Sequence, residues 1–169
     1  MDSFFLTNRL QNNIEIFKSL ITGMNEDQYQ WKSQPEKWSI LEVIHHLYDE
    51  EKEDFRLRIE CVLENPSKDW EPINPPQWVI DRKYNDQDLN DIFNKLIAER
   101  KKSIKWLNSL KSPDWNKIYV HPKIGKISAG DMLSSWVAHD FLHIRQIINL
   151  NLEYYKYNSL PFDTKYAMP

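Results

Sequence analysis

Apolar residues recur every three or four positions in four long segments of the chain, the spacing that places them on one face of an α-helix. In the first segment the repeat includes Leu6, Leu10 and Ile14. It stops at Thr22-Gly23, where glycine readily adopts the left-handed conformation that ends many helices. The pattern predicts long helices over residues 3–22, 39–63, 86–110 and 128–154.

Polar residues at the boundaries of these segments support the predicted limits. Ser39 with Glu42, and Ser128 with Asp131, have the spacing of a capping box, in which two side chains satisfy backbone N–H groups at a helix start. Pro66 follows the second segment, and the residue before a proline avoids the helical conformation. The second and fourth helices should therefore begin at these serines.

The connections between the helices differ in length. Residues 67–85 contain three prolines and predict a crossover between the second and third helices, or a functional lid. Residues 115–127 predict a short extended loop, residues 25–28 a turn of helix, and residues 155–169 a tail that packs on the bundle or on a partner subunit. Together these features predict an all-α fold: a single domain, 1–169, built as a four-helix bundle with a long crossover between helices 2 and 3.

Composition narrows the class of protein. The 169 residues carry a net charge of −3 with acidic and basic residues interspersed, so the basic surface typical of nucleic-acid-binding proteins is missing. Three glycines are few for a β-rich chain, which favours helices. No apolar run approaches the roughly 20 residues that span a membrane, and no signal-peptide pattern opens the chain, so we expect a cytoplasmic protein. Cys61 is the only cysteine, which excludes an internal disulfide and predicts a small, buried, apolar residue.

Two histidines in the fourth predicted helix are the strongest candidates for chemistry. His139 and His143 are four residues apart, so both lie on one helix face and could bind one metal ion. The spacing alone is a weak signal, because a histidine in a helical bundle is more often an ordinary hydrogen-bonded residue of the core or the surface. Asp140 stands where the zincin motif requires glutamate, so the sequence does not predict a metalloprotease.

A third ligand would have to come from the remaining histidines, which are His45, His46 and His121. His45 and His46 lie near the start of the second helix, and either could supply it. The apolar stripe of that helix centres nearer His45, but Val43 and Leu47 flank His46 and a bundle helix contacts two neighbours. His121 precedes the fourth helix, where it is either an exposed loop residue or part of the mouth of the site.

Two motifs together resemble the DinB/YfiT-like superfamily across most of the chain. They are Trp-Ser-Ile at 38–40 leading to His46-Leu47, and the His139-x-x-x-His143 pair with Gln146 one turn later. The resemblance implies a four-helix bundle that binds a divalent metal, usually zinc or nickel, on His46, His139 and His143. The family pattern places the ligand of the second helix directly before an aliphatic residue, which selects His46.

The resemblance also implies a class of activity. Three nitrogen ligands leave a tetrahedral ion with one open position, as in catalytic zinc sites. A water or a thiol bound there becomes a nucleophile at neutral pH. Members of the superfamily include thiol S-transferases that use low-molecular-weight thiols and proteins described as metal-dependent hydrolases, and dimers are common among them. We therefore expect a metal-dependent transferase or hydrolase of a small-molecule substrate, with a homodimer compatible with the sequence.

Four polar residues near the histidines are candidates for catalytic roles, namely Asp49, Glu50, Asp140 and Gln146. The carboxylates could orient the imidazoles or act as a base, or they could simply be solvated helix surface. Gln146 could bond a ligand or have a structural role. Two alternatives need no catalysis: a metal-binding or stress-response bundle, and a helical interaction module whose histidines bind no metal.

Overall fold

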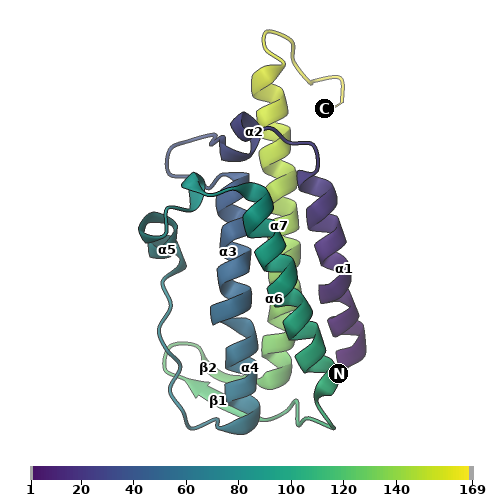
Figure 1. Cartoon of the computed structure of the whole chain (residues 1–169). Helices are drawn as coiled ribbons and strands as arrows, with labels where there is room; N and C mark the ends of the chain where they lie inside the picture. Colours follow the sequence, from purple (N-terminus) through teal and green to yellow (C-terminus); the bar gives the residue numbers. More distant parts are fainter. Residues whose placement is uncertain (1, 168–169) are drawn as a thin grey trace.

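The computed structural model describes residues 2–167, and Figure 1 shows a bundle of long helices with a small β-hairpin at one end. The elements, in chain order, are α1 (Ser3–Ile21), α2 (Glu26–Gln30), α3 (Ile40–Glu53), α4 (Phe55–Glu64), α5 (Pro75–Asp81), the 3-10 turn η1 (Tyr84–Asp86), α6 (Leu89–Ser109), β1 (Ile118–His121), β2 (Gly125–Ser128) and α7 (Ala129–Asn158). Both predicted capping boxes are confirmed, at Ser39 with Glu42 and at Ser128 with Asp131. Within the described residues, no helix has the length and apolar character needed to cross a membrane.

Four helical segments form the sides of the bundle. The first is α1, the second is α3 continued by α4, the third is α6 and the fourth is α7. Helices α1 and α7 run in one direction, whereas α3–α4 and α6 run in the other (Figure 1). Because α3 and α6 are parallel, the chain after α4 has to return along the outside of the bundle before α6 can begin (Figure 1). The predicted four-helix bundle with a long crossover between its second and third helices is confirmed.

The second predicted helix, 39–63, is not continuous. It breaks at Asp54, whose φ of −123° and ψ of −92° lie outside the helical region. Asp54 ends α3 by donating its N–H to Glu50 O at 3.1 Å, and it begins α4 by accepting from Arg58 N at 2.9 Å. Its carboxylate also pairs with the Arg58 side chain. The Asp54 side chain makes no capping hydrogen bond to the backbone. The apolar repeat of the sequence continues past this position, so it does not predict the break.

The crossover is more ordered than the sequence indicated. The prolines that suggested an irregular connection include the first two residues of α5, positions where a missing N–H costs no hydrogen bond. The third long helix begins at Leu89 rather than at residue 86, because Asp88 caps it by accepting from Asp91 N at 2.7 Å. The 3-10 turn η1 occupies the residues just before this cap.

Two further boundaries differ from the prediction. The extended loop expected at 115–127 forms a two-stranded antiparallel hairpin in which Ile118 pairs with Ser128 and His121 with Gly125. Gly125 has a φ of +78°, a conformation that L side chains rarely adopt. At the C-terminal end, α7 continues to Asn158, so the first residues of the predicted tail 155–169 are helical.

The buried apolar residues form two clusters, one in each half of the bundle. Near the end of α1 and the start of α3, the cluster includes Phe17, Leu41, Leu96 and Ile147. The second cluster lies in the half nearer the hairpin and includes Leu10, Ile59, Leu133 and Trp136. Burial of each such side chain contributes roughly 1.5–3 kcal/mol to folding, so these clusters are the main source of stability.

A layer of buried polar side chains separates the two clusters. Asn13, Glu51, Arg100 and Asp140 come from α1, α3, α6 and α7 respectively, and each is at most 2% exposed. Arg100 donates to Glu51 Oε2 at 2.9 Å and to the two Asp140 oxygens at 2.8 and 2.9 Å. Asn13 Nδ2 donates to Asp140 Oδ2 at 3.0 Å. The layer therefore ties all four sides of the bundle together at one height.

Candidate metal centre

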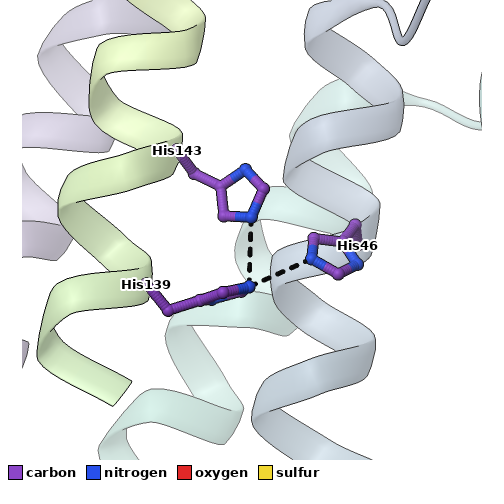
Figure 2. Close-up of side chains that lie close together, drawn as sticks. All are labelled: His46, His139 and His143. Carbon is purple, nitrogen blue, oxygen red and sulfur yellow. Dashed lines mark hydrogen bonds between the residues drawn. The ribbon is translucent and has the colours of Figure 1, made fainter. Parts of the chain in front are cut away.

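Three imidazoles from two helices converge beside this polar layer. His46 projects from α3 and meets His139 and His143, which are one turn apart on α7 (Figure 2). The Nε2 atom of His139 lies 3.2 Å from that of His46 and 3.1 Å from that of His143. One ring nitrogen of each residue lies within 4.8 Å of the other two. The helix spacing brings the α7 pair together, and the packing of α3 on α7 adds the third ring.

The spacing of these nitrogens fits a metal ion. In a tetrahedral site with metal–nitrogen bonds of 2.0–2.1 Å, neighbouring nitrogens are about 3.3 Å apart. Two of the three nitrogen–nitrogen distances, 3.1 and 3.2 Å, are close to this value, and the third, between His46 and His143, is within 4.8 Å. Within residues 2–167, the group contains no cysteine and no carboxylate, so the donors are three imidazole nitrogens.

Burial keeps these imidazoles neutral. Desolvation, together with the proximity of the other rings, lowers the pKa of His46 to about 3 and that of His139 to about 2. Burial also lowers the pKa of His143. Neutral rings carry the lone pairs that a metal ion requires, so the site is ready to bind without first losing protons at neutral pH.

These shifts predict how the metal-free protein responds to acid. The unfolded chain protonates His139 near the ordinary value of 6.5, whereas the folded chain does so only near 2, so between these values the unfolded state binds more protons. Stability must therefore fall as the pH drops through this window. We expect the unfolding free energy of the wild type to fall by up to about 1.4 kcal/mol per pH unit more steeply than that of His139→Gln between about pH 6 and 4. Urea titrations in the presence of a chelator measure both slopes, and parallel slopes would contradict the assignment.

Gln146 fixes the orientation of one ring. Its Oε1 lies 2.8 Å from His143 Nδ1. A neutral imidazole that donates from Nδ1 has its lone pair on Nε2, the atom that faces His139. The predicted candidate Gln146 therefore contacts His143, one turn before it on α7.

Loss of this contact should weaken metal binding. We expect Gln146→Leu to lower the affinity for zinc about ten-fold, as removal of a ligand's hydrogen-bond partner commonly does. Gln146→Glu retains an acceptor and should restore most of the affinity. Competition with a chromophoric chelator measures both values, with Asn149→Leu, an exposed amide on the same helix, as the control. An equal loss in Asn149→Leu would show that the Nδ1 contact has no specific role.

Glu50 is the carboxylate nearest to the cluster. Its Oε1 lies 3.9 Å from His46 Nδ1, a buried atom without a hydrogen-bond partner. Burial and the neighbouring Asp54 carboxylate raise the pKa of Glu50 to about 8. On the other side of His46, the Trp38 ring lies 4.9 Å from the imidazole, between ring centroids. Of the three predicted carboxylate candidates, Glu50 is the one that the fold places beside a ligand ring.

Asp49 and His45 belong to a neighbouring cluster on the crossover side of α3. His45 stacks on Tyr84 with 3.8 Å between ring centroids, and the Tyr84 hydroxyl donates to Asp49. Asp49 also pairs with Arg82 at 2.7 Å. His45 is therefore turned away from His139 and His143, and Asp49 anchors the crossover to the bundle. Tyr84 and Arg82 follow a proline-rich stretch, and no motif or periodicity in the sequence marked them as partners of this cluster.

Asp140 faces the interior of the bundle rather than the ring nitrogens. Its two oxygens accept from Arg100 and Asn13 in the polar layer. Glu51, the other carboxylate of that layer, accepts from Trp136 Nε1 at 3.0 Å. Sequence reasoning missed Glu51 and Arg100, although Arg100 occupies a position in the apolar stripe of its helix, and that anomaly was a usable signal.

The other two residues considered from the sequence lie outside the histidine cluster. His121 is on the hairpin, where its Nδ1 accepts from Lys123 N at 3.1 Å and Ile124 N at 3.3 Å. Cys61 was predicted to be buried, but it is only partly buried. It lines a surface cavity of about 290 Å³, and its thiol lies 3.5 Å from Asn65 O. Cys61 is on the side of α4 that faces the crossover, where its thiol also lies 3.6 Å from Lys68 O, whereas the adjacent Val62 is buried in the core.

Comparison with known proteins agrees with this architecture. The family model of the DinB superfamily matches residues 9–147, a range that includes all three histidines. A protein of Oceanobacillus iheyensis named "Putative metal-dependent hydrolase" is 24% identical over 144 residues, which are 85% of this chain and 82% of that protein.

Among solved structures, YfiT from Bacillus subtilis is described as "a probable metal-dependent hydrolase with an unusual four-helix bundle topology". It matches with a TM-score of 0.78 at 19% identity, over 88% of this chain and 85% of YfiT. This likeness confirms the fold, and the family model, which covers most of the chain, establishes the relationship. The chain belongs to the DinB superfamily.

Proposed function

We propose that this protein is a metal-dependent enzyme in which His46, His139 and His143 hold one divalent ion. The observation that carries the proposal is the convergence of three neutral imidazoles with nitrogen spacings of 3.1 and 3.2 Å. Neutral nitrogen donors suit zinc or nickel better than magnesium or calcium, which prefer oxygen. The names of the two relatives, both of which refer to a metal-dependent hydrolase, support the same class of protein.

The donor set favours catalysis over a purely structural role. The described residues supply three ligands, and structural zinc sites are usually closed by four protein ligands. A bound divalent ion with an open position lowers the pKa of a water or thiol placed there and so provides a nucleophile at neutral pH. His139 and His143 are only partly buried, so a small molecule can reach this side of the centre.

The surrounding residues have distinct roles in this proposal. Gln146 holds the His143 ring in the tautomer that directs Nε2 to the centre. Glu50, with a pKa of about 8, can take up or release a proton near neutral pH on the Nδ1 side of His46. Asp49 and Asp140 have structural roles, because one anchors the crossover and the other belongs to the buried polar layer. Water and a low-molecular-weight thiol are the two nucleophiles that this arrangement suits, giving a hydrolase or a thiol S-transferase.

Turnover by the metal-loaded protein tests the proposal. Protein reconstituted with zinc or nickel is assayed against a panel of activated esters and amides, and separately against electrophiles in the presence of small thiols, with His139→Ala as the control. We expect metal-dependent turnover with one nucleophile class, absent in the variant. Tight metal binding without turnover in either panel would instead favour the alternative of a non-catalytic metal-binding bundle.

A further inference from the structure

Phe55 lies against one of the candidate ligands, on a helix that carries none of them. It is the first residue of α4, and its side chain is 7% exposed. Its ring lies 5.1 Å from the His139 ring, between centroids, at an interplanar angle of 56°. It also stacks on Trp136, three residues before His139 on α7, with 5.6 Å between centroids and an angle of 5°. The metal centre therefore has an aromatic neighbour that the histidine motifs do not include.

The helix break at Asp54 brings Phe55 to this position. Successive residues of a helix turn by about 100°, so in an unbroken helix Phe55, nine residues after His46, would point about 180° away from it. The side chain on the same side as His46 would be that of Leu57. In the structure Leu57 is 47% exposed, whereas Phe55 is buried against α7. The break at Asp54 therefore rotates α4 relative to α3 and turns Phe55 toward the helix that carries His139.

The three ligand rings differ in the contacts that hold them. The Nδ1 atom of His143 pairs with Gln146, and the Glu50 carboxylate lies 3.9 Å from Nδ1 of His46. Within the part of the chain that the structure describes, the hydrogen-bonding contacts of the His139 ring involve only its Nε2, which faces the other two ligands. The orientation of this ring in the metal-free protein therefore depends on the side chains packed against it.

We propose that Phe55 is a positioning residue for the metal centre, because its ring holds the His139 imidazole in the orientation that directs Nε2 to the ion. The inference rests on the proposed function, since it presupposes an ion on the three histidines. The torsion that rotates an imidazole about its Cβ–Cγ bond has broad minima, so such a ring samples many orientations unless contacts restrict it. Restriction before binding reduces the entropy that the ligand loses when the ion arrives.

Phe55 can restrict the ring because its own position is fixed. It stacks on Trp136, which is 1% exposed and donates from Nε1 to Glu51 at 3.0 Å. Glu51 in turn accepts from Arg100 in the buried polar layer. The polar layer thus supports the metal centre through two stacked rings, without contributing a ligand.

The zinc affinity of the metal-free protein, measured by competition with a chromophoric chelator, tests the proposal without a turnover assay. We expect Phe55→Ala to weaken zinc binding about ten-fold, the lower end of the loss that follows removal of the residues that orient a ligand. Ile59→Ala is the matched control, because Ile59 is buried in the same apolar cluster one turn further along α4. Both variants lose packing, but Ile59→Ala should bind zinc as the wild type does.

The visible absorption of the cobalt(II)-loaded protein gives a second readout, because its d–d bands report the geometry of the ligands rather than the stability of the fold. We expect Phe55→Ala to change these bands and Ile59→Ala to leave them as in the wild type. Phe55→Leu and Ile59→Val form a more conservative pair, which decides the question if an alanine variant does not fold. Phe55→Leu should again bind zinc more weakly than its control.

Two results would refute the proposal, and they can be told apart. Equal zinc affinities within each pair of variants would overturn the role of Phe55 while leaving the three-histidine centre intact. A wild type that binds neither zinc nor cobalt tightly would overturn the metal centre itself and, with it, this inference.

Discussion

Replacing His46 with alanine should abolish tight metal binding, whereas replacing its neighbour His45 should leave about one ion per chain. His46 is one of three converging donors, and its Nε2 lies 3.2 Å from that of His139. His45 stacks on Tyr84 and does not face the cluster. Loss of one of three ligands leaves two protein donors, too few to retain zinc or nickel through dialysis. Elemental analysis after loading with one equivalent of zinc and dialysis measures the difference.

The two histidines form a matched pair for this experiment. They are adjacent in α3, and both are buried: His46 is 5% exposed and His45 is 7% exposed. Each substitution removes the same buried ring, so a general loss of packing should affect both variants. Circular dichroism confirms that both are folded before metal is added. Retention of the ion by His46→Ala together with its loss from His45→Ala would refute the ligand assignment.

Replacing Arg100 with methionine should destabilise the metal-free protein by about 3–5 kcal/mol, the usual cost of leaving buried charges unpaired. Arg100 is 2% exposed and is the cation that pairs with both Glu51 and Asp140. Its removal leaves two buried carboxylates without their counter-charge. Because domains of this kind are typically stable by about 5–15 kcal/mol, the variant should unfold at a much lower urea concentration.

Two comparisons separate charge from packing. Arg56→Met removes an arginine whose pair with Glu99 is closer to the surface, and it should cost about 1 kcal/mol or less. Combining Arg100→Met with Glu51→Gln and Asp140→Asn removes the buried charges and should recover part of the lost stability. An Arg100→Met variant no less stable than Arg56→Met would contradict the role of the polar layer.

The choice between His45 and His46 shows where reasoning from one helix fails. The helical wheel of the second segment favoured His45, because the main apolar stripe of that helix centred near it. In the structure, α3 contacts α6, α7 and the crossover. His45 is covered by Tyr84 from the crossover, and His46 meets α7. A single-helix wheel contains no information on which neighbour covers which flank, so the resemblance to a family, rather than the pattern of polarity, selected the residue that joins the cluster.

The buried polar layer shows a second kind of information that a single helix does not contain. The sequence marked Asp140 as a candidate for the metal site because it follows His139 directly. Neighbours on a helix point about 100° apart, so Asp140 turns into the core and meets Arg100 from a helix 40 residues away. The identity of that partner depends on the alignment of α6 with α7. The anomaly of a charged residue in an apolar stripe was visible, but its counter-charges were not.

The sequence by itself determined the features that depend on short-range periodicity and backbone chemistry. These include the four helical sides of the bundle, the capping boxes at Ser39 and Ser128, and the pairing of His139 with His143 on one face. Each follows from residues within about one turn of each other, where helix geometry fixes which side chains are neighbours. Only the tertiary structure decided that His46 joins them and that Asp54 interrupts the helix predicted over residues 39–63. Those outcomes depend on the relative height and rotation of packed helices, which many distant contacts determine together.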